Sequence, residues 1–198
     1  MNRQLNSIVR LSLWIGLVMM LVVFSAATKT KEQVRWRNPE QLTASDFRRD
    51  TAGRRVKVKT GKRTWRVLEG YIYSGIAYRF EQKGSDVRYE VYAFMLPDES
   101  WLSDPENRGT LRHEQAHFNI TEIHARKLRE SLLKVRNPEE AKRKYKQVIT
   151  ELAKTQADFD ADHMGESDVT EHWQRKIQRE LNERSAFAAA VVIPPSGR

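Results

Sequence analysis

The stretch that decides the fold occupies residues 110–134 and reads TLRHEQAHFNITEIHARKLRESLLK. Its apolar residues recur at the three- and four-residue spacing of an amphipathic helix, and Thr110 is a residue type that caps helix N-termini. We therefore predict one long helix from about Thr110 to Lys134. Residues four apart on a helix share a face, so the imidazoles of His113 and His117 would project side by side.

These two histidines belong to the pattern His-Glu-x-x-His, which begins at His113 and is typical of zinc hydrolases. Both rings could bind one Zn²⁺ ion, and Glu114, one position round the helix, could act as the catalytic acid/base on a water at that ion. The alternative is a pair of surface histidines on an ordinary helix. The motif's place in the first turns of a long amphipathic helix, directly after a predicted sheet, favours the zinc site. His124 lies about 10 Å further along the helix and cannot share the ion.

A catalytic zinc needs a third protein ligand and keeps one position open. A second helix is predicted to start at the capping sequence Asn137-Pro138. If the two helices form a hairpin, His117 lies level with about residue 155 and His113 with about residue 159, because both helices rise about 1.5 Å per residue. His163 follows this level and is the best imidazole candidate. The carboxylate alternatives are Asp158, Asp160, Asp162 and Glu166.

The chain on either side of these two helices gives the fold class. Residues 64–80 are rich in aromatic and β-branched residues, residues 82–86 form a predicted hairpin turn, and residues 87–96 alternate between apolar and polar. These segments predict an antiparallel sheet of three or four strands, with a short strand near residues 34–36. A third helix is predicted from Asp168, and no regular structure in the tail at residues 186–198. The fold class is α+β, with a small antiparallel sheet followed by three helices.

The N-terminus carries a predicted export signal. Arg3 and Arg10 precede an apolar run at residues 13–24, and small residues follow it up to Ala27. This order is that of a secretory signal peptide, with cleavage after Ala27. The alternative is an uncleaved membrane anchor, because the segment from Leu11 to Ala27 is nearly long enough to span a bilayer. Either alternative places residues 28–185, the predicted catalytic domain, outside the cytoplasm, in the periplasm or the extracellular space.

Composition narrows the chemistry further. The chain has 198 residues and no Cys, which excludes disulfides, thiolate nucleophiles, Cys-ligated zinc and a lipoprotein anchor. The formal net charge is +9, and most of the excess lies between Arg48 and Arg66. This basic segment could bind an anionic membrane or envelope polymer, or be an ordinary solvated loop. Trp65 is the single aromatic residue of this segment, so the segment does not indicate nucleic-acid binding.

The motif helix also carries a family resemblance. Residues 111–128, LRHEQAHFNITEIHARKL, closely resemble the motif helix of the bacterial domain of unknown function 922 family, described as predicted secreted zinc-dependent proteases. Shorter stretches at residues 42–47, 74–78, 99–102 and 158–165 fit in the same order. The resemblance implies a zincin-like fold in which His113, His117 and His163 bind zinc and Glu114 is catalytic. Met164 departs from the family pattern, where His is followed directly by Gly.

The sequence therefore predicts an exported zinc-dependent peptidase that hydrolyses peptide bonds of a peptide or protein substrate. The alternative is a non-catalytic envelope module with a structural metal site, which docks on anionic surfaces through the basic segment. A Glu114→Gln substitution would distinguish them, because only the peptidase depends on this carboxylate for its function.

Overall fold

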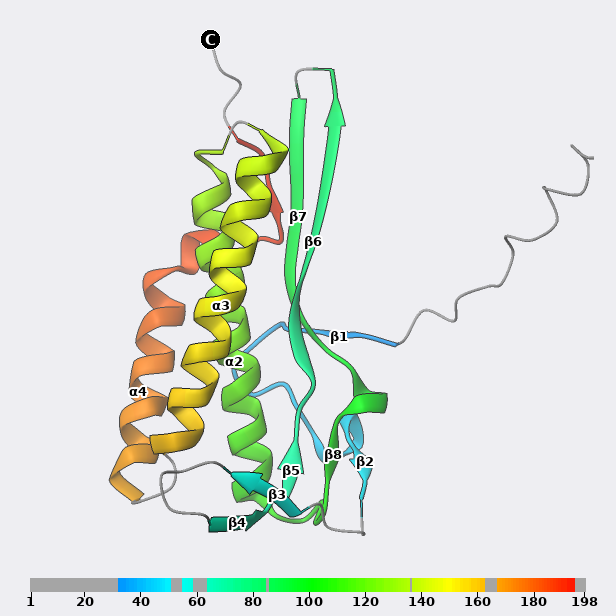
Figure 1. Cartoon of the computed structure of the whole chain (residues 1–198), viewed down its shortest axis with the longest axis vertical. Helices are drawn as coiled ribbons and strands as arrows, with labels where there is room; N and C mark the ends of the chain where they lie inside the picture. Colours follow the sequence, from blue (N-terminus) through cyan, green and yellow to red (C-terminus); the bar gives the residue numbers. More distant parts are fainter. Residues whose placement is uncertain are drawn as a thin grey trace, which may run out of the picture. The chain divides into compact units, whose positions relative to one another are not determined.

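The computed structural model describes residues 32–50, 55–58, 64–84, 86–135, 137–162 and 167–194; for residues 55–58, 64–67 and 167–170 it describes the backbone alone. The described residues belong to one compact unit that begins at Glu32. Its regular elements, labelled in Figure 1, are in chain order β1 (Val34–Arg35), η1 (Ala44–Asp46), β2 (Arg48–Arg49), β3 (Arg55–Val58), β4 (Thr64–Val67), β5 (Gly70–Tyr71), β6 (Ser74–Lys83), β7 (Asp86–Met95), η2 (Pro97–Glu99), β8 (Trp101–Leu102), α2 (Arg108–Leu132), α3 (Pro138–Asp162), α4 (Ser167–Glu183), η3 (Ser185–Phe187) and β9 (Val191–Val192).

The largest sheet is built on the long hairpin of β6 and β7. Its register runs from Ser74 opposite Met95 to Lys83 opposite Asp86, and Gly84 in the turn has φ 61°, a left-handed conformation that favours glycine. β1 and β9 both pair antiparallel with β7, so this four-stranded sheet is entirely antiparallel. Together with the helices that follow, it confirms the predicted α+β class.

The alternation predicted for residues 87–96 is confirmed in β7. Tyr89, Val91, Ala93 and Met95 are buried, whereas the residues between them are partly exposed. Side chains of a strand point alternately to its two faces, so these four residues line one face of the sheet. That face packs against the helices, where it joins the core formed with Phe118 and its neighbours.

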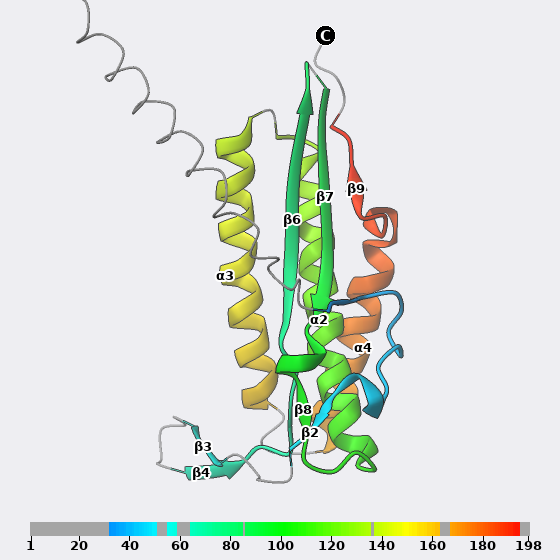
Figure 2. The same cartoon turned by 90° about the vertical axis from the view of Figure 1, so that its right-hand side faces the viewer.

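Helix α2 is the centre of the molecule. It contacts both long strands of the hairpin as well as α3, α4, β5 and the C-terminal elements. In Figures 1 and 2, α3 and α4 flank α2, and the β6–β7 hairpin runs along the helical layer. Because α2 is surrounded in this way, polar as well as apolar residues of this helix are buried.

The helix starts follow the predicted caps, with one correction. Asn107, rather than Thr110, caps α2, and its side chain accepts hydrogen bonds from the backbone N–H groups of Gly109 and Thr110. The Thr110 hydroxyl instead donates to the carboxylate of Glu69, which ties the helix start to the strand region before β5. Both residue types can cap a helix, so the spacing of apolar residues alone did not select between them.

The other helix starts agree more closely with the sequence. Asn137 accepts a hydrogen bond from the Glu140 backbone N–H at 2.9 Å, as the predicted cap of α3 requires. Helix α4 begins at Ser167, one residue before the predicted start. Three long helices therefore follow the sheet, as predicted.

A second small sheet was not predicted. β8 lies between β2, with which it is parallel, and β5, with which it is antiparallel. Each of its strands has only two residues, too few to show an alternating pattern. This sheet positions β5 against the start of α2, where the candidate site lies.

The tail at residues 186–198 was predicted to be irregular, and this prediction is wrong for its first half. η3 and β9 are regular, Val192 is buried, and β9 pairs with Tyr89 and Glu90 of β7. Burial of Val192 and the hydrogen bonds to β7 stabilise a strand too short to be recognised from its sequence.

The predicted signal segment at residues 1–27 lies outside the described residues. In the part of the chain that the structure does describe, none of the helices combines the length and the apolar character needed to span a bilayer.

Candidate metal site

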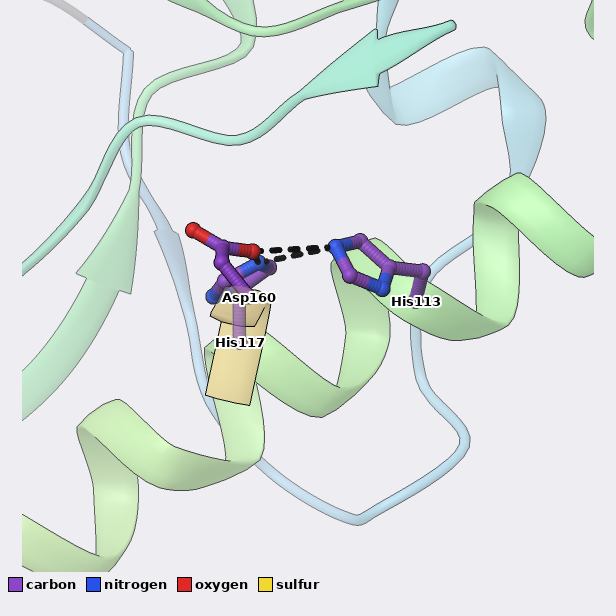
Figure 3. A group of neighbouring side chains, drawn as sticks. All are labelled: His113, His117 and Asp160. Atoms are coloured by element: carbon purple, nitrogen blue, oxygen red, sulfur yellow. Dashed lines mark hydrogen bonds and ion pairs between the residues drawn. The ribbon is translucent and has the colours of Figure 1, made fainter. Parts of the chain in front are cut away.

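Three side chains from two helices meet at one point. His113 and His117 project from α2, and Asp160 reaches them from α3 (Figure 3). The His117 Nε2 atom lies 2.9 Å from Asp160 Oδ1 and 3.1 Å from His113 Nε2, and the distance from His113 Nε2 to Asp160 Oδ1 is 3.3 Å. Two imidazole nitrogens and one carboxylate oxygen thus form a small triangle, a donor set that suits a divalent metal ion.

Helices α2 and α3 form a hairpin, and it places side by side the residues that the predicted register pairs. His113 was predicted to lie opposite about residue 159 and His117 opposite about residue 155. In the structure His113 stacks on Phe159, with 4.9 Å between ring centroids, and His117 contacts Gln156 and Asp160. The register that a hairpin of the two helices implied is therefore confirmed.

The contacts of the carboxylates on α3 narrow the choice of the third ligand. Of the predicted candidates, His163 and Glu166 lie outside the described residues. Asp158 pairs with Lys154 at 3.0 Å, and Asp162 accepts a hydrogen bond from the Trp173 indole at 3.0 Å. Asp160 is therefore the candidate that the described residues place beside both histidines.

One wall of the site is aromatic. Phe159 is fully buried, stacks on His113, and meets the rings of His117 and Trp173 edge-on with centroids 4.8 and 5.3 Å apart. Asp160, in contrast, keeps 58% of its side chain exposed. The cluster therefore has a dry side that holds the imidazoles in place and an open side that faces solvent.

The charges of the cluster depend on each other. Burial alone would raise the pKa of Asp160, but its hydrogen bonds with His113 and His117 outweigh this effect and hold that pKa below its usual range. Burial alone would lower the pKa of His117, but the hydrogen bond to Asp160 and the nearby carboxylate of Glu114 raise it. Both shifts favour a state with positive charge between the ring nitrogens and the carboxylate.

Glu114 lies beside the cluster but is not part of it. Only 3% of the residue is exposed, and the backbone N–H of Ile72 donates a hydrogen bond to its carboxylate. Burial raises its pKa to about 7; repulsion from Asp160 adds to this rise, whereas His117 and the Ile72 hydrogen bond oppose it. A carboxyl group with a pKa near neutrality can both accept and return a proton at working pH.

Gly70 in β5 leaves the space that Glu114 occupies. A methyl group at this position would lie 2.7 Å from Thr110 Cγ2, 2.9 Å from Glu114 Oε1 and 3.0 Å from Leu102 Cδ2. All three distances are well below ordinary van der Waals contact, so a side chain here would push β5 away from α2 and displace the carboxylate.

Replacing Gly70 by Ala should therefore destabilise the chain by about 1–3 kcal/mol and reduce any activity that depends on Glu114. Denaturant unfolding measures the first effect. Gly75→Ala is the matched control, because the atoms nearest to its added methyl, at 3.1 Å and beyond, belong to the partly exposed ring of Phe94, which can shift. Equal stability of the two variants would contradict the close packing of β5 on Glu114.

His124 lies apart from the cluster, as its position along α2 predicts, and is a buried histidine. It is 2% exposed, its Nδ1 atom lies 2.9 Å from the Ile120 carbonyl, and its Nε2 atom lies 3.3 Å from the Thr155 hydroxyl. Burial is the main cause that lowers its pKa. It takes no part in the triangle formed by His113, His117 and Asp160.

The sequence did not predict two groups that contact the site residues, the side chain of Gln156 and the backbone N–H of Ile72. A signal for Gln156 existed, because it lies four residues before Asp160 on the predicted second helix. Residues 156 and 160 thus share a face, as do 113 and 117, and the predicted register brings the two faces together. Nothing in the sequence pattern indicates that the Ile72 N–H points at Glu114.

Comparison with known proteins agrees with the motif. Residues 107–168 match the model of a family described as bacterial protein of unknown function (DUF922). The match starts at the cap of α2, extends through α3, and includes Glu114 and the three residues of the cluster. No curated protein and no solved structure matches the chain. The resemblance carried by the motif helix is confirmed, because residues 107–168 of this chain match the DUF922 family model.

Proposed function

We propose that this chain is a zinc-dependent peptidase that acts outside the cytoplasm on peptide or protein substrates. The observation that carries the proposal is the convergence of His113 Nε2, His117 Nε2 and Asp160 Oδ1, next to the buried carboxylate of Glu114. The export signal predicted at residues 1–27 supports the location.

The size of the triangle fits zinc. Zinc binds imidazole nitrogen and carboxylate oxygen at about 2.0–2.1 Å, so neighbouring ligand atoms of a tetrahedral site lie about 3.3 Å apart. The three distances of 2.9, 3.1 and 3.3 Å are close to this value. In a chain without Cys, the side chains that usually bind zinc offer nitrogen and oxygen donors alone.

The three atoms all carry lone pairs, and this supports a cation bound between them. A carboxylate oxygen and two imidazole nitrogens would repel one another if only lone pairs met, so a proton or a metal ion must lie between them. A proton can bridge one pair of these atoms, whereas a divalent ion can bind all three at once. Three protein ligands and an open side are the arrangement of catalytic rather than structural zinc sites.

Glu114 would carry the proton chemistry. Bound zinc would supply a polarised carbonyl and a water of lowered pKa. Glu114 would accept the proton of the attacking water and return it to the leaving amine, which completes hydrolysis of the peptide bond. Burial of the Glu114 side chain and its hydrogen bond from the Ile72 N–H hold the carboxylate in one place for this transfer.

Removal of one ligand tests the site. Asp160→Asn should weaken zinc binding by at least about 100-fold, because losing a direct ligand costs more than the roughly 10–100-fold loss typical of its supporting residues. Asp158→Asn is the matched control, since Asp158 is equally exposed on α3 but pairs with Lys154. Zinc content after dialysis, and hydrolysis of unfolded protein substrates with and without a chelator, provide the readouts.

The outcome also decides between the candidate third ligands. If Asp160→Asn keeps its zinc and His163→Ala loses it, His163 is the ligand that the family resemblance implies, and Asp160 is not. If the wild-type chain binds no zinc under these conditions, the peptidase proposal is wrong.

A further inference from the structure

We propose that Gln156 is a positioning residue that holds the ring of His117 with its Nε2 atom toward the ion, and so sets the affinity of the site. The proposal rests on the proposed zinc site but concerns a residue that binds no metal itself. Gln156 lies on α3 one turn before Asp160, so one helix face supplies both the ligand and the residue that orients its neighbour.

The contacts of Gln156 determine which way its amide points. Its Nε2 atom lies 3.0 Å from the backbone carbonyl of His117, and its Oε1 atom contacts Nδ1 of the same residue. A backbone carbonyl can only accept, so the NH₂ group must face it and Oε1 must face the ring. His117 Nδ1 therefore carries a proton and donates it to Oε1.

The amide is held by a second contact. Its NH₂ group also donates to the Thr121 hydroxyl at 3.2 Å; Thr121 is fully buried and donates its own proton to the His117 carbonyl at 3.0 Å. Ser74, at the start of β6, lies 2.9 Å from the same hydroxyl oxygen. The chain of hydrogen bonds thus joins β6, α2 and α3, and every group in it has a consistent role as donor or acceptor.

Protonation of Nδ1 determines the state of Nε2, on the other side of the His117 ring. With its proton on Nδ1, the neutral ring keeps a lone pair on Nε2, the atom 2.9 Å from Asp160 Oδ1 and 3.1 Å from His113 Nε2. The opposite tautomer would need the amide reversed, which would place Oε1 against the His117 carbonyl and two acceptors in contact. The network therefore favours the metal-binding form of His117 before any ion arrives.

Zinc affinity tests this role. Gln156→Leu should weaken zinc binding by about 10–100-fold, the usual effect of removing a group that supports a ligand. Gln156→Glu keeps an acceptor for the Nδ1 proton but loses the donor to the His117 carbonyl, so it should recover part of the affinity. Gln147→Leu, an exposed position on α3 whose side chain donates to Glu151, is the control and should bind zinc as the wild type does. Competition with a chelator of known affinity gives these values.

A second measurement does not depend on the metal. In the metal-free full-length chain, at a pH where the imidazole is neutral, the ¹⁵N shifts of His117 report which nitrogen is protonated. We expect the Nδ1–H form in the wild type and in Gln156→Glu, and a mixture in Gln156→Leu. Equal tautomer populations in the wild type and Gln156→Leu would overturn the role of Gln156, even if zinc binds.

Failure of the peptidase proposal and failure of the inference about Gln156 would therefore give different results. A wild-type chain that shows the Nδ1–H form but binds no zinc contradicts the peptidase proposal and leaves the orienting role of Gln156 supported by the tautomer measurement. A folded Gln156→Leu variant with unchanged zinc affinity contradicts the inference about Gln156 alone.

Discussion

Glu114→Gln is expected to abolish hydrolysis and, at the same time, to stabilise the metal-free chain above neutral pH. The loss of activity should be about 10²–10⁴-fold, the usual contribution of a general base, with zinc retained because Glu114 is not a ligand. The gain in stability follows from burial, which raises the pKa of this carboxyl group to about 7 from its ordinary value of 4.5.

The direction of the pH dependence follows from proton binding. In the folded chain Glu114 holds its proton up to about pH 7, whereas in the unfolded chain it releases the proton above about pH 4.5. Between these values the unfolded state binds fewer protons, so the stability that the protonated group contributes is complete below pH 4.5 and is lost as the pH rises through 7. A shift of this size corresponds to about 3 kcal/mol. A glutamine cannot ionise and should avoid this loss.

Denaturant unfolding of the chelated wild type and variant at pH 4.5 and pH 8 measures the effect. The difference in unfolding free energy should grow by about 3 kcal/mol toward pH 8. Glu130→Gln, at an exposed position of the same helix, is the control and should show no such growth. A difference that does not change with pH would contradict the buried, protonated state of Glu114. Hydrolysis that persists in the variant would contradict its role as general base, and zinc without hydrolysis in either chain would favour the non-catalytic envelope module.

The parts of the fold that the sequence predicted share one property, which is local periodicity. Helix α2, the start of α3 at Asn137 and the buried face of β7 each depend on residues within a few positions of one another. β8 and β9 have two residues each and form only because distant partners bury them. No local pattern could have indicated them.

In the candidate site, too, local spacing predicts one part, and the other part depends on long-range packing. His113, Glu114 and His117 lie within five residues, so their spacing alone indicates a metal site. Asp160 was one of four predicted carboxylates, because the register of a helical hairpin is known from the sequence only to within about one turn. The choice among the four depends on the direction of each side chain, and Asp158 and Asp162, two residues to either side, point to Lys154 and Trp173 instead.

A second buried glutamate of α2 should respond to the same substitution in the opposite way. Glu122 is 2% exposed and lies between two buried arginines. Arg126 Nε donates to Glu122 Oε1 at 2.9 Å, and Arg129 donates to both carboxylate oxygens at 2.9 and 3.2 Å. The carboxylate therefore compensates guanidinium charge inside the core.

The arginines in turn hold the C-terminal part of the chain. Arg126 Nη1 donates to the Leu181 carbonyl at 2.7 Å. Arg129 donates to the carbonyls of Val91 and Phe187 at 2.9 and 2.7 Å. The cluster thus links α2 to β7, the end of α4 and η3. Without a counter-charge both guanidinium groups would remain buried next to carbonyl groups alone.

Glu122→Gln should therefore lower the unfolding free energy by about 3–5 kcal/mol, the usual cost of leaving a buried charge without its partner. Guanidinium chloride unfolding measures this loss, with Glu130→Gln as the exposed control on the same helix. Hydrogen exchange should increase first at the Val91 backbone N–H, which donates to the Ala190 carbonyl at 2.8 Å and marks the contact of the C-terminal segment with β7. A loss below about 1 kcal/mol would contradict the role of this cluster. Glutamates 114 and 122 are both buried in α2, so opposite effects of the same substitution would come from their surroundings alone: two guanidinium groups compensate the charge of Glu122, whereas burial favours the protonated form of Glu114.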